Sequence, residues 1–178
     1  MPEFVLRPAE RGDLEGLTEI YNHYVATSIA TFDLAPQRSE ERTAWFDLHS
    51  GGRYRLWVVG VSGGPVVGYA SSSPFRPRLA YQTTVEVSVY LAPSALGHGL
   101  GSRLYRALFD SIQDEDLHRA AAVIALPNPA SVALHTKWGF REVGRLNEVG
   151  RKFDRFWDVA FFERPLERGV PVVSKGKR

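Results

Sequence analysis

The sequence contains no cysteine and only one methionine among its 178 residues. The absence of cysteine excludes disulfide bonds, thiolate metal sites and a cysteine nucleophile, and it favours a cytoplasmic protein. Long hydrophobic runs are missing too: the longest, residues 56–61 and 120–126, are far too short to cross a bilayer. Residues 1–4 lack the basic start of a signal peptide. We therefore expect a cytoplasmic protein without a membrane partner.

An excess of charge of one sign is also missing, because 22 Lys and Arg face 20 Asp and Glu, for a net charge of +2. Such a balance, without basic residues interleaved with aromatic ones, does not indicate a nucleic-acid partner. The composition, 44% hydrophobic and 24% charged, is that of an ordinary globular chain. With no internal repeat and no linker, we expect one domain over residues 1–166 and a flexible tail over 167–178.

Apolar residues recur with two periods along the chain. A period of three to four predicts helices after Asp13, from Ser39 onward, and over residues 100–112. Asn128 and Gly139 are suited to begin and end a further short helix. Alternating or compact apolar stretches predict strands at residues 4–7, 56–61, 66–73, 83–91, 120–126, 140–149 and 153–162. This order predicts an α/β (α+β) fold, with a mixed, mostly antiparallel central sheet and helices on both faces.

Three alternate glycines, Gly97, Gly99 and Gly101, lie between a predicted strand and a predicted helix. Glycine admits positive φ and lets a ligand approach the backbone, and successive N–H groups at a helix start suit a pyrophosphate. The spacing is neither that of a Walker A loop nor G-x-G-x-x-G. From these residues alone, a phosphate site and a purely structural turn are equally good interpretations.

Glu86 interrupts a strand between Val85 and Val87. Glutamate is disfavoured in strands, and a buried carboxylate is costly unless it is paired or its pKa shifts. Two interpretations stay open: a glutamate on the exposed face of the sheet, or a general base placed just before the glycine loop.

The helix after Asn128 carries a further candidate. Ser131 and His135 are four residues apart and share one face, while Leu134 and Trp138 share another. His135 is either a surface histidine or a functional one. Neither histidine–carboxylate metal spacing nor a G-x-S-x-G elbow occurs, so we predict no metal and no serine hydrolase.

A strand with an acid, a glycine loop, a helix, another strand and then Asn128 to Phe140 follow one another in the order found in GNAT acetyltransferases. The chain resembles this family over residues 4–166, and within it the phosphinothricin and methionine sulfone/sulfoximine N-acetyltransferase group. The most specific stretches are residues 20–23, 31–33, 84–90, 99–102, 128–140, 149–153 and 157–158.

The resemblance implies a GNAT fold, acetyl-CoA as co-substrate, a small amino-acid-like amine as acceptor, and a homodimer. It implies Glu86 as the general base, and it places His135 where many members carry a tyrosine. The implied cofactor-binding residues are Ser88, Val89, Tyr90, Leu96, Gly97, His98, Gly99, Leu100, Gly101, Asn128, Ser131 and Lys137. The implied substrate-binding residues are Phe32, Arg78, Tyr81, Val85 and Val87. Leu96 departs from the Gln or Arg that commonly opens the loop, which removes one side-chain contact to the phosphates.

The expected reaction is direct attack of the amine on the acetyl thioester, with Glu86 as base and backbone N–H groups stabilising the oxyanion. No covalent acyl-enzyme is required, in agreement with the absence of cysteine. We expect Arg78 to lie beside an anionic group of the substrate. We expect His135 to face the thioester sulfur and protonate the thiolate, with Leu134 and Trp138 toward the core. The alternatives are a non-catalytic acyl-CoA sensor, an RNA-associated protein, and acetylation of a protein N-terminus or lysine.

Overall fold

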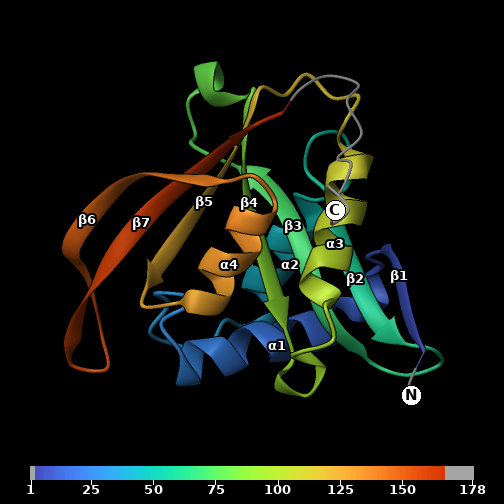
Figure 1. The fold of residues 1–178 in the computed structure, drawn as a ribbon. Helices are drawn as coiled ribbons and strands as arrows, with labels where there is room; N and C mark the ends of the chain where they lie inside the picture. Colours follow the sequence, from blue (N-terminus) through green and yellow to red (C-terminus); the bar gives the residue numbers. More distant parts are fainter. Residues whose placement is uncertain (1–2, 167–178) are drawn as a thin grey trace, which may run out of the picture.

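The computed structural model describes residues 3–166, which form one seven-stranded sheet with four α-helices (Figure 1). The strands are β1 (Phe4–Pro8), β2 (Leu56–Val61), β3 (Val66–Pro74), β4 (Thr84–Leu91), β5 (Arg119–Leu126), β6 (Arg141–Lys152) and β7 (Arg155–Pro165). The helices are α1 (Leu14–Thr27), α2 (Ser39–Asp47), α3 (Leu100–Ser111) and α4 (Pro129–Lys137). The short 3₁₀ turns are η1 (Arg11–Asp13), η2 (Leu79–Tyr81) and η3 (Pro93–Ala95). The tail expected over 167–178 lies outside the described residues.

The strands are ordered β1-β2-β3-β4-β5-β7-β6 across the sheet. All neighbouring pairs are antiparallel except β4 and β5, which are parallel. The predicted mixed, mostly antiparallel sheet is therefore confirmed. The parallel pairing is short, since it joins Thr84–Glu86 to Arg119–Ala121 and stops there, after which the two strands spread apart (Figure 1).

The two faces of the sheet are covered by different helices, as the alternating side chains of the strands require. On one face, Leu104 and Leu108 of α3 belong to the same buried cluster as Val59 of β2. On the other face, Leu17 of α1 packs with the neighbouring Val58. Figure 1 shows α3 in front of the sheet and α2 behind it. The prediction of helices on both faces is confirmed.

The helix starts differ in detail from the sequence expectation. Asp13 does precede α1, but its carboxylate accepts the Glu10 N–H at 2.7 Å and pairs with Arg7 at 2.7 Å instead of capping α1. Before α2, the Glu41 carboxylate accepts the Arg38 N–H at 2.9 Å. In both cases the carboxylate of an acidic side chain near the start of the helix accepts the N–H of a residue that precedes the helix.

The hairpin of β6 and β7 is longer than predicted and projects beyond the rest of the sheet (Figure 1). Its turn is made by Phe153 and Asp154, with φ of 53° and 56°. Nearly all of β6 is exposed. Several of the exposed side chains of this hairpin are apolar: Val143, Leu146, Val149, Phe153 and Phe156.

Candidate functional site

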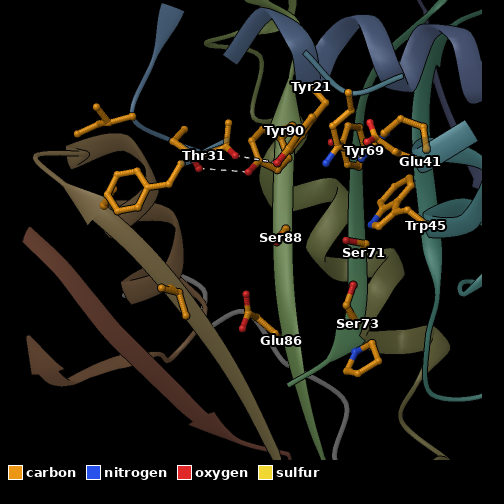
Figure 2. Close-up of a pocket in the computed structure, with 18 of the residues that line it drawn as sticks. Tyr21, Thr31, Glu41, Trp45, Tyr69, Ser71, Ser73, Glu86, Ser88 and Tyr90 are labelled. Carbon is orange, nitrogen blue, oxygen red and sulfur yellow. Dashed lines mark hydrogen bonds between the residues drawn. The ribbon is translucent and has the colours of Figure 1, made fainter. Parts of the chain in front are cut away.

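A cavity of about 500 Å³ lies on the α1 and α2 side of the sheet. Figure 2 shows one wall, where Ser71 and Ser73 of β3 stand beside Glu86, Ser88 and Tyr90 of β4. The cavity is lined by Tyr21, Ile29, Ala30, Thr31, Phe32, Gln37, Glu41, Arg42, Trp45, Tyr69, Ser71, Ser73, Pro74, Glu86, Ser88, Tyr90, Val123, Ala125 and Val159. Its size suits a small ligand.

Alternation along β4 decides which of its side chains reach the cavity. Glu86, Ser88 and Tyr90 line it. Val85 and Val87 point to the opposite face and are 0% and 3% exposed in the core beneath α3. The expectation that the Val85 and Val87 side chains line a substrate site is therefore wrong, because a strand sends successive side chains to opposite faces.

Glu86 is neither fully buried nor freely solvated, with 32% of its side chain exposed. Burial raises the pKa of Glu86, and the Arg76 guanidinium, 3.7 Å from its Oε2, opposes that rise. A raised pKa makes this carboxylate a stronger base than a surface glutamate while leaving it able to ionise. A partly exposed carboxylate of this kind, facing a cavity, is able to accept a proton from a bound ligand.

Neither Arg78 nor Tyr81 lines the cavity, although both were expected at a substrate site. Tyr81 lies in η2 and packs against the ring of Phe75, with the two centroids 5.8 Å apart. The arginine that reaches Glu86 is Arg76, two residues earlier. The sequence gave no indication of this Arg76–Glu86 contact, because the path of the loop decides which of its arginine side chains turns inward.

A second arrangement borders the cavity, on the open edge of β4. Beyond Glu86, β4 continues to Leu91 and β5 to Leu126, but the ladder between them has ended. The backbone of Ser88, Val89 and Tyr90 therefore has a strand partner only on its β3 side within the described chain. An extended ligand can pair with such an edge. This open edge fits the expectation that Ser88, Val89 and Tyr90 bind the acetyl-CoA co-substrate.

The glycine loop follows directly. Gly97 and Gly99 have φ of 79° and 69°, which side chains rarely adopt, and no heavy atom lies within 4 Å of where a Cβ would stand on either. Gly99 is also the N-cap of α3. Open glycine backbone at a helix N-terminus fits a pyrophosphate. Leu96 is 55% exposed, and the ring of His98 lies 5.6 Å from that of Phe4.

Leu100 and Gly101, at the start of α3, also have a packing role. A Cβ on Gly101 would lie 3.2 Å from Leu134 Cδ2, so this glycine lets α3 approach α4 closely. Leu100 is 1% exposed and belongs to the core. These two positions are therefore fixed by packing, and any contact that they make with a phosphate is through their backbone N–H groups at the start of α3.

In α4, Asn128 caps the helix as predicted, since its Oδ1 accepts the Ser131 N–H at 3.1 Å. Lys137 is exposed in the last turn. His135 is 3% exposed, and its ring packs against Tyr105 and Phe140. The interpretation of His135 as a surface histidine is therefore wrong.

Both ring nitrogens of His135 have partners. Nδ1 lies 2.8 Å from the Ser131 carbonyl, which can only accept, so Nδ1 carries the proton. Nε2 then accepts the Tyr105 hydroxyl at 2.7 Å. Burial lowers the pKa of His135, against the effect of the Ser131 carbonyl. This neutral, enclosed ring does not line the cavity, so it holds α4 against α3 instead of meeting a substrate.

The cavity wall is supported by a histidine, His49, that was not identified as a site residue from the sequence. His49 Nδ1 lies 2.8 Å from the Trp45 carbonyl, so Nε2 accepts the Ser73 hydroxyl at 2.9 Å. Burial lowers the pKa of His49, which favours this neutral form. Ser73, opposite Glu86 in the β3–β4 register, therefore keeps its lone pairs for a donor in the cavity.

Phe32 lines the cavity, as expected, and its position depends on Gly150 of β6. A Cβ on Gly150 would lie 2.0 Å from Cε2 of the Phe32 ring. The Phe32 ring therefore packs directly against the backbone of Gly150. Nothing in the local sequence indicated this contact between residues 118 positions apart.

Arg42, in the first turn of α2, is one of the lining residues that sequence reasoning missed. It is 2% exposed. One signal was present: Arg42 lies in helical phase with Trp45 and His49, which mark the buried side of α2. A cation on the apolar stripe of a helix indicates either a buried ion pair or a ligand.

The chain is similar to known proteins over most of its length. Residues 17–140 match the profile of the acetyltransferase (GNAT) family. The phosphinothricin N-acetyltransferase of Streptomyces coelicolor is 52% identical over 166 residues, which cover 92% of this chain and 97% of that protein. The L-methionine sulfoximine/L-methionine sulfone acetyltransferase of Pseudomonas paraeruginosa is 36% identical over 91% of this chain and 94% of its own length.

A solved structure shows the same fold. The phosphinothricin acetyltransferase from Sinorhizobium meliloti, in complex with AcCoA, superposes with a TM-score of 0.88 at 36% identity, covering 97% of this chain and 93% of that one. Within residues 3–166 no helix is long and apolar enough to cross a bilayer. The same residues contain no group of three or more His, Cys, Asp or Glu that could hold a metal ion.

Proposed function

This chain belongs to the acetyltransferase (GNAT) family, and from that premise we propose that it transfers the acetyl group of acetyl-CoA to the amino group of a small, amino-acid-like substrate. Phosphinothricin and methionine sulfone or sulfoximine are the substrates named for its relatives. One observation carries the proposal: Glu86 faces a cavity of about 500 Å³ at the point where β4 separates from β5.

Glu86 acts as the general base. A primary ammonium is not nucleophilic until it loses a proton, and Glu86, with its raised pKa, accepts that proton directly or through a water. The Ser73 hydroxyl, which donates to His49, offers a lone pair to the same ammonium. These two groups, from neighbouring strands, orient and deprotonate the amine.

The free amine attacks the thioester carbonyl, and a new C–N bond forms as the C–S bond breaks. Backbone N–H groups on the open edge of β4, at Ser88 to Tyr90, stabilise the oxyanion that develops. The thiolate of CoA leaves and takes up a proton; by analogy with cysteine its pKa is about 8.5. His135 takes no part in this step in our proposal, because its ring is enclosed and hydrogen-bonded on both nitrogens.

We place this activity in a single domain over residues 1–166 of a cytoplasmic homodimer. The support for a dimer is the β6–β7 hairpin, where Leu146, Val149, Phe153 and Phe156 are 48% to 59% exposed. A second copy packed around this hairpin would bury apolar surface that a monomer leaves in water. Sedimentation of the wild type and of Phe156→Asp tests this, and a monomeric wild type would remove the dimer.

The proposed activity is tested by following thiol release from acetyl-CoA with phosphinothricin, methionine sulfone and methionine sulfoximine. We expect turnover with at least one of them. Glu86→Gln, which keeps the shape of the side chain, should lower kcat by about 10²–10⁴-fold and leave acetyl-CoA binding unchanged. A protein that binds acetyl-CoA but acetylates no amine would instead be a sensor. Turnover restricted to peptides would indicate a protein acetyltransferase.

A further inference from the structure

Arg42 is the one charged side chain that is almost fully buried at the cavity wall in the described chain. Its guanidinium carbon lies 3.8 Å from the ring centroid of Trp45 and 4.8 Å from that of Tyr21. The π faces of these rings offset part of the cost of burying a cation. They carry no charge, so they do not neutralise it.

The hydrogen-bonding groups of Arg42 are largely unused. Nε and Nη2 are buried and have no hydrogen-bond partner, and Nη1 makes one long bond, 3.4 Å, to Gln37 Oε1. The guanidinium also interacts with the Tyr69 hydroxyl, a neutral group. None of the ion pairs found among residues 3–166 includes Arg42. A buried cation without a counter-charge is costly, and buried arginines are normally paired.

Neither of the nearby carboxylates pairs with Arg42. Glu41, which also lines the cavity, accepts the Arg38 N–H at 2.9 Å and lies 3.7 Å from the Arg38 guanidinium. The carboxylate of Asp33 is separated from Arg42 by Gln37, whose Nε2 donates to it at 2.8 Å, and it also accepts the Tyr21 hydroxyl at 2.8 Å. The pKa of Tyr21 is raised by burial to about 12, and burial also raises that of Tyr69, so both hydroxyls stay neutral near Arg42. The positive charge of Arg42 therefore acts on the cavity itself.

Arg42 and Glu86 lie toward different ends of this cavity. Figure 2 shows Tyr21, Tyr69 and Tyr90 gathered at the end away from Glu86, with Ser88 on the strand between. Four residues of strand, from Glu86 to Tyr90, span about 13 Å. An amine held near Glu86 directs the far end of its own molecule toward Arg42.

We propose that Arg42 recognises a terminal oxyanion on the side chain of the substrate, such as a phosphinate, at the end of the cavity opposite the reacting amine. This inference rests on the proposed function. A phosphinate brings a negative charge and two acceptor oxygens, which a guanidinium matches. Arg42 is thus a specificity-determining residue for anionic over neutral side chains, the role that we had expected of Arg78.

The test compares phosphinothricin, whose side chain ends in an anionic phosphinate, with methionine sulfone, whose side chain is polar but neutral. We expect Arg42→Gln to lower kcat/KM for phosphinothricin about ten- to a hundredfold more than for methionine sulfone. Arg42→Lys, which keeps the charge, should retain part of the preference. Arg11→Gln is the control, since it removes the same charge from an exposed arginine that pairs with Asp47 of α2 at 3.1 Å; its substrate ratio should match the wild type.

Equal losses for both substrates in Arg42→Gln and Arg42→Lys would overturn the proposal and assign Arg42 to packing alone. If the wild type acetylates neither substrate, the proposed function fails, and calorimetry then decides about Arg42. Phosphinothricin binding that weakens about tenfold in Arg42→Gln but not in Arg11→Gln would sustain the oxyanion site. Undetectable binding, or equal binding in all variants, would remove it.

Discussion

The contact between Phe32 and Gly150 allows a perturbation whose size follows from the coordinates. In Gly150→Ala the new methyl group would stand 2.0, 2.5 and 2.7 Å from three atoms of the Phe32 ring. Carbon atoms pack at about 3.5–4.0 Å, so the ring must move by about 1.5 Å. Gly150 does not have a positive φ, so the backbone itself accepts alanine.

Such a shift should affect substrate binding more than folding. Phe32 is only partly buried, so its ring can move, and we expect a loss of unfolding free energy near the low end of the 1–3 kcal/mol that overpacking costs. In the cavity, a displacement of this size changes the shape offered to the substrate. Because misplacement by about 1 Å can cost as much as a hundredfold, we expect KM for the amine to rise about tenfold.

The assay is steady-state kinetics with the amine and acetyl-CoA varied separately, together with thermal unfolding. KM for acetyl-CoA should not change, since its expected site lies on the β4 edge and the glycine loop. Gly144→Ala is the matched control on the same strand, because no heavy atom lies within 4 Å of its Cβ position.

A double mutant tests the route of the effect. If Gly150→Ala acts through the ring, adding it to Phe32→Ala should change KM no further, because the clash has gone. Two results would refute the argument that Phe32, held against Gly150, shapes the substrate site. One is an unchanged KM in Gly150→Ala. The other is a Gly150→Ala effect on KM of the same size in the wild type and in Phe32→Ala.

Three further predictions concern the base, the loop and the buried histidine. Burial raises the pKa of Glu86 and Arg76 lowers it, so kcat should fall as the pH drops through this pKa. Arg76→Gln should move this acidic limb of the pH–rate profile to higher pH. If the limb does not move, it reports the titration of another group. Gly99→Ala, at φ 69°, should cost about 1–2 kcal/mol of stability and weaken acetyl-CoA binding at least tenfold, measured by calorimetry; intact affinity would make the loop structural. His135→Phe leaves the Tyr105 hydroxyl without its acceptor, so the unfolding free energy should drop by about 1–3 kcal/mol while kcat changes little; a large loss of kcat at unchanged Tm would restore a catalytic role.

Much of the fold could be predicted from the sequence because local periods decide it. Leucines recur every four residues from Leu100 to Leu108, and this spacing predicted the buried stripe of α3. The alternation of apolar and polar side chains around Glu86 predicted β4. Positive φ at Gly97 and Gly99 likewise follows from residue type and position.

The site was predicted less completely because it is assembled from contacts distant in sequence. Helical spacing showed that His135 shares a face with Ser131 but not which way that face points, and packing against Tyr105 decided it. Arg42 was missed because its significance depends on the partners it lacks, which only the folded chain reveals. The contact of Phe32 with Gly150 leaves no local pattern at all.

Because the β4–β5 ladder ends early, co-substrate binding at this edge should also affect the stability of the folded protein. A ligand that pairs with this edge binds the native chain and not the unfolded one, so it shifts the unfolding equilibrium by mass action. At a free concentration one hundred times its Kd, acetyl-CoA would add about 2.7 kcal/mol to the unfolding free energy, a large share of what a domain of this size possesses. The resistance of this protein to proteolysis should therefore follow the acetyl-CoA supply of the cell that makes it.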